Sequence, residues 1–230
     1  MHTGELLGSG RSADVFAIDD HWVLRRYRDG GDATAEAVVM SYLGKHGYPV
    51  PRVRDPAGLP RTDLVIRRLS GPSMLQALRQ GTITAEEAGA TLANVLHRLH
   101  RIPARVSTDP ADRVLHLDLH PDNVMFTPDG AMVIDWRNTQ EGPPGLDWGM
   151  SALILAQVAV GTAAEVAEAR AVLTALLRHL DPAVDLGDGD TGCLTQAKKR
   201  RATDPAMSGN EAHILDDAME LVLELKPARA

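Results

Sequence analysis

The chain has few of the residues that define several classes of protein. Among its 230 residues there is one cysteine, Cys193, so no disulfide can form within the chain. Aromatic residues make up only 3% and the net charge is -7, which argues against a nucleic-acid-binding surface, even at the basic run 198–201. The apolar segment 151–160 is too short to span a bilayer. We therefore expect no nucleic-acid partner and no membrane partner.

Other absences bear on localisation and domain number. No charged start followed by an apolar run marks a signal peptide, so we expect a cytoplasmic protein. The chain shows no internal repeat or low-complexity tract, and hydrophobic residues make up 44% of it. That content is enough for one substantial core or for two lobes. The pattern points to no particular oligomeric state.

What the chain does contain is a dense polar motif, HLDLHPDN at residues 116–123, followed by VIDW at residues 133–136. Together these motifs place Asp118, Asn123 and Asp135 on two neighbouring turns. Phosphoryl transfer needs one carboxylate to orient the attacking hydroxyl group and oxygen ligands for magnesium near the nucleotide phosphates. The three residues supply that set, so the spacing indicates a kinase active centre.

Two other interpretations of the same residues stay open at this point. His116, Asp118 and His120 alternate, so they would share one face of a strand, as the metal ligands of a hydrolase could. Pro121 argues against a regular strand here because it lacks the N–H that a central strand needs. The segment could also be a polar loop without chemistry, so its context must decide.

The two motifs resemble the catalytic region of the aminoglycoside phosphotransferases and of the related choline-kinase-like and homoserine-kinase-like small-molecule kinases. The usual family form is HGDLHPGN followed by IDW or IDF, so Leu117 and Asp122 stand where the family has glycine. The resemblance implies a catalytic base, two magnesium ligands and a structural histidine, and these roles fall respectively on Asp118, Asn123, Asp135 and His116.

A glycine-containing turn near the N-terminus fits the nucleotide-binding part of such a kinase. Residues 6–16 read LLGSGRSADVF, and glycines let backbone N–H groups approach phosphates closely. Gly-Ser-Gly is also an ordinary hairpin turn, and it gains weight here from preceding the later motif. By resemblance, Gly8, Ser9 and Gly10 would cradle the phosphates and Val15 would contact the adenine.

A strand and a helix are predicted to follow this turn, over residues 22–27 (WVLRRY) and 32–43. In the related kinases the strand carries a phosphate-binding lysine, and Arg25 aligns best with it. A guanidinium group can still bridge two phosphate oxygens, although it differs from an ammonium group in geometry. By resemblance, Glu36 on the helix would pair with Arg25 and orient it. The alternatives are a charged strand edge for Arg25 and a solvated Glu36.

A second β-prone segment, residues 63–69 (DLVIRRL), predicts a buried strand that ends before Ser-Gly-Pro. In the related kinases such a strand places the adenine edge against backbone groups. The resemblance therefore makes Arg68 and Leu69 the adenine contacts, although an apolar strand that ends in Gly-Pro occurs in many folds.

The chain turns helical beyond this strand. Thr84, with Glu87 three residues later, predicts a capped helix that reaches His100, and we expect its histidines to be surface or packing residues. By resemblance, Asp147 accepts backbone N–H groups of the catalytic loop, and it also suits a helix N-terminus. Further helices are expected over residues 151–160, 163–180 and 209–225.

The sequence thus predicts an α+β, two-lobed protein-kinase-like fold. Residues 1–69 would form a small antiparallel β lobe with one helix, and residues 70–230 a larger helical lobe with the catalytic loop and the acceptor site. ATP or GTP with Mg²⁺ would lie between the lobes, and the γ-phosphoryl group would pass to a hydroxyl group of a small molecule. Aminoglycosides and other amine-containing antibiotics or metabolites are candidate acceptors, because the protein is acidic.

A different class of function fits part of the pattern. Arg25 in place of lysine, Ala13 in place of the third loop glycine and a short C-terminal region suggest a catalytically impaired pseudokinase. Such a protein would sense nucleotide or bind a partner without phosphate transfer, or would bind nucleotide regardless of magnesium. The enzyme interpretation instead requires nucleotide binding that depends on magnesium and turnover with a hydroxyl acceptor.

Overall fold

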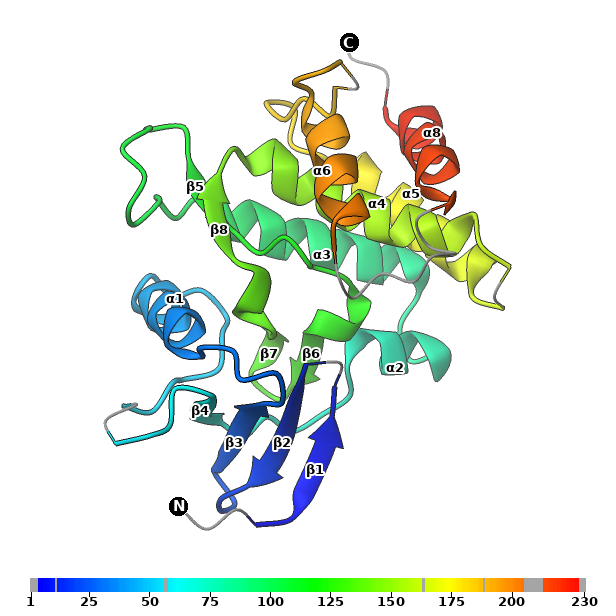
Figure 1. Cartoon of the computed structure of the whole chain (residues 1–230). Helices are drawn as coiled ribbons and strands as arrows, with labels where there is room; N and C mark the ends of the chain where they lie inside the picture. The colour runs from blue at the N-terminus through cyan, green and yellow to red at the C-terminus, as the bar shows by residue number, and fades with distance from the viewer. Residues whose placement is uncertain are drawn as a thin grey trace. The chain divides into compact units, whose positions relative to one another are not determined.

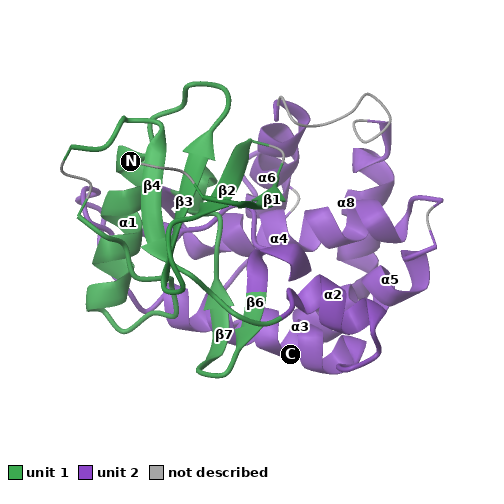
Figure 2. Ribbon diagram, turned by 90° about the horizontal axis from the view of Figure 1, so that it is seen from below, with its two compact units in different colours: residues 1–71, 125–139 green, residues 72–124, 140–230 purple. Residues whose placement is uncertain are grey.

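The chain forms two compact units, which Figure 2 shows in different colours. The computed structural model describes residues 4–10, 12–55, 58–162, 164–187, 189–204 and 213–227. The first unit comprises residues 1–71 and 125–139, and the second comprises residues 72–124 and 140–230.

The first unit is built on a four-stranded antiparallel sheet in the order β1-β2-β3-β4, visible in Figure 1. The strands are β1 (Leu6–Ser9), β2 (Ala13–Ala17), β3 (Trp22–Tyr27) and β4 (Asp63–Arg67). The Gly-Ser-Gly segment leads from β1 into β2, and the register of this pair shifts between Leu6 and Gly8. The register of β3 puts Arg25 opposite Val15 on β2 and opposite Leu64 on β4.

One helix, α1 (Thr34–Lys45), belongs to the first unit. Its buried residues recur at helical spacing and are Glu36, Ala37, Val39, Met40 and Leu43. Glu36 alone among them carries a charge. A carboxylate taken out of water must be hydrogen-bonded inside the protein, so the surroundings of Glu36 have to supply donors.

A hairpin and a short turn complete the first unit, namely β6 (Val124–Thr127), β7 (Gly130–Val133) and the 3₁₀ turn η2 (Trp136–Asn138), although Val124 itself is grouped with the second unit. Gly71 approaches this hairpin so closely that a Cβ would lie 1.8 Å from the carbonyl oxygen of Phe126, and its φ is +127°. The N–H of Val133 donates to the carbonyl of Pro49 at 2.8 Å. These non-local contacts are why residues 125–139 group with the N-terminal part, whereas the sequence prediction assigned them to the helical lobe.

The second unit is mainly helical. Its helices are α2 (Met74–Arg79), α3 (Ala85–Leu99), α4 (Pro144–Ala159), α5 (Val166–Arg178), α6 (Cys193–Ala202) and α8 (Leu215–Leu225). Helix α4 packs against α5, α6 and α8, and α3 packs along α5 (Figure 1). Two short strands, β5 (Arg113–Leu115) and β8 (Gln140–Gly142), pair with each other, and the 3₁₀ turn η1 spans Pro121–Asn123. Because α4 is covered by three helices, it is buried on nearly every side.

The α+β class predicted from the sequence is confirmed. The capping box is present, since Thr84 and Glu87 each accept the other's backbone N–H, and α3 ends one residue before His100. The predicted C-terminal helix corresponds to α8, while residues 209–212 of that prediction lie outside the described residues. In the part of the chain that the structure describes, no helix combines the length and apolarity needed to cross a bilayer.

Gly89 allows α3 and α5 to pack closely, so we predict a specific cost for Gly89→Ala. A Cβ here would lie 2.4 Å from Cβ of Ala175 and 2.7 Å from the backbone nitrogen of Leu176. We expect the free energy of unfolding to fall by about 1–3 kcal/mol, because overpacking outweighs the helix preference of alanine, which is about 1 kcal/mol. Urea unfolding would measure this change.

Gly44→Ala in α1 is the matched control, because its Cβ would meet only Cγ2 of Val50, at 3.8 Å. This control should be neutral or slightly stabilising. A Gly89→Ala variant as stable as the Gly44→Ala variant would contradict the packing argument.

Candidate functional site

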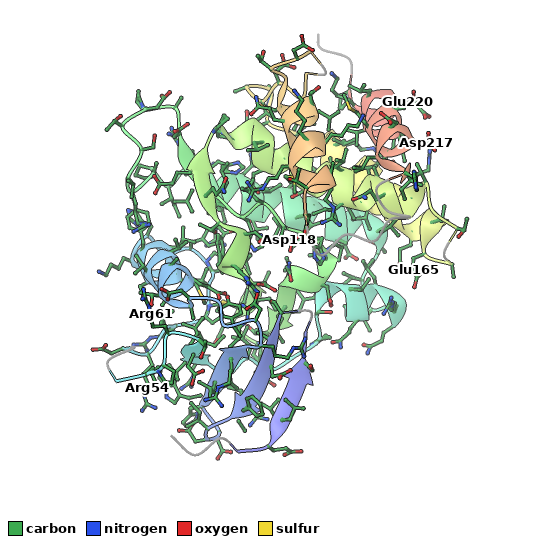
Figure 3. The ribbon with its side chains drawn as sticks, viewed as in Figure 1. Arg54, Arg61, Asp118, Glu165, Asp217 and Glu220 are labelled. Atoms are coloured by element: carbon green, nitrogen blue, oxygen red, sulfur yellow. The ribbon has the colours of Figure 1, made fainter. Side chains whose placement is uncertain are left out.

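In the second unit, a buried carboxylate holds the loop that carries Asp118, which is labelled in Figure 3. Asp147, at the start of α4, is fully buried and accepts the N–H groups of His116 at 3.0 Å and Leu117 at 2.7 Å. Its Oδ2 also lies 3.0 Å from Nε2 of His100. Burial alone would raise the pKa of Asp147, but these donors hold it below its usual value. Asp147 therefore makes the loop contacts that the resemblance implies.

Leu117 has a backbone conformation that glycine adopts more easily, with φ at +63°. Its side chain is 1% exposed and lies in a core cluster with Leu115, Met150 and Ala197. A left-handed conformation costs a non-glycine residue about 1–2 kcal/mol. Burying a leucine side chain contributes about 1.5–3 kcal/mol. Packing thus compensates for the strain, which explains how leucine can occupy a position that is glycine in the family form.

Asn123 and His116 are fixed by hydrogen bonds within the same loop. Nδ2 of Asn123 donates to the carbonyl oxygen of Asp118 at 2.8 Å, so the amide is oriented and its oxygen faces away from this contact. An amide oxygen is a ligand that Mg²⁺ accepts, so Asn123 fits the predicted role. His116 is fully buried, and its Nδ1 accepts the N–H of Asp118 at 3.2 Å.

His120 makes a hydrogen bond within the loop and Asp122 ties the loop to the start of α2, and both contacts were missed by sequence reasoning. Nδ1 of His120 accepts the N–H of Asp122 at 3.3 Å, and burial lowers the pKa of His120. Oδ1 of Asp122 accepts the hydroxyl of Ser73 at 2.9 Å, while the same hydroxyl accepts the N–H of Gln76 and caps α2. The second departure from the family form therefore adds a contact between the loop and α2.

The hydrolase interpretation of this segment is wrong. It requires three alternating side chains on one face of a strand, but β5 ends at Leu115 and Leu117 is left-handed. Among the described residues, no group of three or more His, Cys, Asp or Glu side chains is placed to hold a metal ion.

In the first unit, Arg25 joins two carboxylates. Its Nη1 donates to Oε1 of Glu36 at 2.6 Å, and its Nη2 donates to Oδ1 of Asp135 at 2.6 Å. The predicted pairing with Glu36 is confirmed, whereas the contact with Asp135 was not predicted. Burial alone would lower the pKa of Arg25, but the charges of Glu36 and Asp135 raise it, so the guanidinium stays charged. Because Arg25 is 9% and Glu36 4% exposed, neither is the solvated surface residue of the alternative interpretations.

Glu36 collects three donors, two from β3 and one from the turn after β7. Its Oε1 accepts from Arg25 and, at 3.1 Å, from the backbone N–H of Trp136, and its Oε2 accepts the hydroxyl of Tyr27. Burial raises the pKa of Glu36, and the Arg25 charge opposes that rise. The sequence analysis did not name Tyr27 or Trp136 as partners of Glu36. Two features of the sequence could have indicated them: Tyr27 follows Arg25 by two residues and so shares its strand face, and Trp136 is the residue after Asp135.

Asp135 has a left-handed backbone, with φ 62° and ψ 64°. Asp135 and Leu117 are the two non-glycine residues with positive φ in the described part of the chain. Such strained positions persist where the surroundings hold them, and they concentrate at active sites. One carboxylate oxygen of Asp135 binds Arg25 and the side chain is 35% exposed, so the donor chemistry fits a magnesium ligand.

The Gly-Ser-Gly turn is held by Arg28, another residue that sequence reasoning missed. Nη1 of Arg28 donates to Oγ of Ser9 at 2.5 Å and to Oδ1 of Asp14 at 2.8 Å, and Nη2 donates to the carbonyl oxygen of Gly10. These contacts fix the side of the turn that carries the Ser9 hydroxyl and the Gly10 carbonyl.

The remaining predicted nucleotide contacts lie on or beside the sheet. Val15 pairs with Gly8 on β1 and with Arg25 on β3. Arg68 and Leu69 follow β4, and the N–H of Arg68 donates at 2.8 Å to a carbonyl in the β2–β3 turn. That N–H is therefore engaged within the sheet in this structure.

Comparison with known proteins decides the family. The sequence pattern of the phosphotransferase enzyme family matches residues 3–113 and 103–186. The chain belongs to this family. The resemblance seen in the motifs is thereby confirmed, and this phosphotransferase is an enzyme of the small-molecule kinase class, as predicted. Among curated proteins, none matches the chain.

Solved structures share the fold at low sequence identity. A putative aminoglycoside phosphotransferase from Ralstonia eutropha is 14% identical, with 97% of this chain and 93% of that chain covered and a TM-score of 0.55. APH(2")-IIa, solved as a gentamicin complex, is 16% identical, with 96% of this chain and 89% of that chain covered and a TM-score of 0.55. A choline/ethanolamine kinase family protein from Mesorhizobium loti is 15% identical, with 96% of this chain and 87% of that chain covered and a TM-score of 0.54. The predicted kinase-like fold is therefore confirmed.

The strain at Leu117 leads to an unusual prediction about substitutions in the phosphotransferase. We expect Leu117→Gly to lower the free energy of unfolding by about 1–3 kcal/mol, because the lost packing exceeds the strain relieved. Leu117→Ala should cost about 1 kcal/mol more than that, since alanine loses most of the packing and keeps the strain. Chemical unfolding of both variants checks this order, and an alanine variant more stable than the glycine variant would contradict it.

Proposed function

We propose that the phosphotransferase moves the γ-phosphoryl group of ATP or GTP to a hydroxyl group of a small molecule and uses Mg²⁺. The observation that supports this best is the location of backbone strain. In the described part of the chain, the two left-handed non-glycine residues, Leu117 and Asp135, lie beside or within the residues assigned to the chemistry. A buried carboxylate accepts a backbone N–H at or next to each position.

Asp118 is the proposed catalytic base. Its carboxylate would orient the acceptor hydroxyl and accept its proton as the oxygen attacks the γ-phosphorus, while the bond from that phosphorus to the bridging β-phosphate oxygen breaks and ADP or GDP leaves. Oδ1 of Asp118 lies 4.0 Å from Nε2 of His120, and the lowered pKa of His120 favours its neutral form at neutral pH. His116 and Asp147 would keep the loop in the shape that presents Asp118.

Asn123 and Asp135 are the proposed magnesium ligands, through an amide oxygen and a carboxylate oxygen. When bound, Mg²⁺ would neutralise charge on the phosphate oxygens. Arg25 would add a fixed positive charge for the phosphates, oriented by Glu36. The other proposed nucleotide contacts are Gly8, Ser9, Gly10, Val15, Arg68 and Leu69.

The pseudokinase alternative gains no support from the described residues. Arg25 in place of lysine was one of its three motives, beside Ala13 and the short C-terminal region, but Arg25 is charged and paired with Glu36 as an orienting partner should be. The proposal of ATP as donor is supported by a relative solved with streptomycin and ATP and by an amicoumacin kinase solved with AMP-PNP and Ca²⁺.

For the acceptor, we propose an amine-containing compound with a free hydroxyl group. The net charge of -7 favours a cationic ligand, and relatives with this fold have been solved with gentamicin and streptomycin. A phosphate-transfer screen should therefore begin with aminoglycosides and continue to amino alcohols and sugars.

Thermal unfolding with nucleotide tests the magnesium site. ATP or GTP at 100 times its dissociation constant should stabilise the wild type by about 2.7 kcal/mol, or roughly 5–11 °C. Asp135→Asn should lose the magnesium-dependent part of this shift. Asparagine tolerates a left-handed backbone, so the variant should fold.

Asp129→Asn, an exposed change in the β6–β7 turn, is the matched control and should behave as wild type. A shift in wild type that is the same with and without magnesium would refute the proposed site.

Turnover tests the base. With an acceptor found in the screen, Asp118→Ala should lower kcat by about 10²- to 10⁴-fold, because the hydroxyl is no longer oriented and deprotonated. The nucleotide-induced thermal shift should persist. Wild-type turnover in this variant would remove Asp118 from the mechanism.

A further inference from the structure

Tyr27 occupies a place next to the proposed phosphate and magnesium site that no predicted role explains. It ends β3 two residues after Arg25, so both side chains share one face of the strand. Tyr27 is 4% exposed, and its hydroxyl donates to Oε2 of Glu36. Burial and the charge of Glu36 raise the pKa of Tyr27, so the phenol keeps its proton and acts as the donor.

The ring of Tyr27 is also engaged. The guanidinium carbon of Arg25 lies 5.3 Å from the ring centroid and that of Arg137 lies 4.6 Å from it. Arg137 in turn pairs with Asp29, just beyond β3. A cation over an aromatic face is attracted by the ring quadrupole, most strongly where water is excluded. The ring therefore contacts the guanidinium whose direction matters for the phosphates.

Through Glu36, the hydroxyl of Tyr27 can influence Asp135. Glu36 holds two groups that set the position of Asp135: the Arg25 guanidinium bonded to the Asp135 carboxylate, and the N–H of Trp136, the next residue in the chain. Both of these bonds use Oε1. In the described part of the chain, the bond from Tyr27 is the one that engages Oε2. It therefore limits rotation of the Glu36 carboxylate about the bond that joins it to the side chain.

We propose that Tyr27 is a positioning residue for the magnesium ligand Asp135, acting through Glu36. This inference rests on the proposed function of Asp135. Tyr27 needs no contact with nucleotide or metal for this role. Without the Tyr27 hydroxyl, the Glu36 carboxylate could rotate. The Arg25 guanidinium and the Trp136 N–H would then no longer share a well-placed acceptor oxygen. The strained backbone of Asp135 would then be less well held.

The plain alternative is that Tyr27 only fills the core. Both roles allow Tyr27→Phe to lower thermal stability, because the substitution leaves a buried carboxylate oxygen without this donor. Only the positioning role requires a local change at residues 135–136 and a selective loss of magnesium-dependent nucleotide affinity.

The experiment compares Tyr27→Phe with wild type in two measurements on the full chain. The first is hydrogen exchange of the Trp136 amide without nucleotide, which should be about tenfold faster in the variant. The second is calorimetric titration with ATP, with and without Mg²⁺. The magnesium-dependent gain in affinity should fall by about tenfold, while affinity without magnesium should change little.

Tyr42→Phe is the matched control, because it removes the same hydroxyl group from a tyrosine on α1 whose ring packs against the ring of His46. It should leave both measurements unchanged. In a Glu36→Gln background, Tyr27→Phe should have little further effect, since the path runs through Glu36. If Tyr27→Phe does not fold, Arg137→Met removes one cation from the ring and should shift both measurements in the same direction.

The outcomes separate this inference from the proposed function. Unchanged exchange at Trp136 in a folded Tyr27→Phe variant would overturn the positioning role whether or not nucleotide binds. If magnesium raises the nucleotide affinity of the wild type and of Tyr27→Phe equally, the positioning role is overturned and the proposed function stays intact. A wild type that binds no nucleotide with magnesium would overturn both.

Discussion

A carboxylate withdrawn from water must collect hydrogen-bond donors, and this requirement shapes both loops that carry the proposed chemistry. In the second unit, Asp147 takes the backbone N–H groups of His116 and Leu117. In the first unit, Glu36 takes the N–H of Trp136. In each case a backbone donor beside a strained residue is bound to an acidic side chain from a helix. The cost of leaving that carboxylate unsatisfied helps to keep each strained conformation in place, and at Leu117 it acts together with the packing of the side chain.

Three of the departures from the family form are each matched by a contact. Leu117 replaces glycine and is held by the core cluster around it. Asp122 replaces glycine and accepts the hydroxyl of Ser73. Arg25 replaces lysine and uses separate nitrogens for two carboxylates, which the fork of a guanidinium suits better than a single ammonium group. The departures are thus consistent with a working phosphotransferase rather than with decay of its site.

Local patterns were enough to predict several elements of the fold, among them β3, α1 and α3, and one pair in the site. The capping box of α3 and the spacing of buried residues in α1 are properties of short segments, and the Arg25–Glu36 pair spans 11 residues. The contact of Arg25 with Asp135 spans 110 residues, and it depends on how β3 and the turn after β7 pack. The His100–Asp147 contact is non-local in the same way. No spacing rule reports such pairs, so they could not be predicted from this sequence.

The side chain of Leu117 belongs to the core, whereas its backbone belongs to the loop that carries the proposed base Asp118. The interior of the second unit and the setting of Asp118 therefore cannot vary independently. Met150 on α4 and Ala197 on α6 are neighbours of Leu117 in the core cluster, although neither is near the motif in sequence. A substitution at these positions of α4 or α6 would change the packing around Leu117 and so the conformation of the loop. Selection for a new acceptor should accordingly recover changes at such interior positions as well as at ligand-contacting ones.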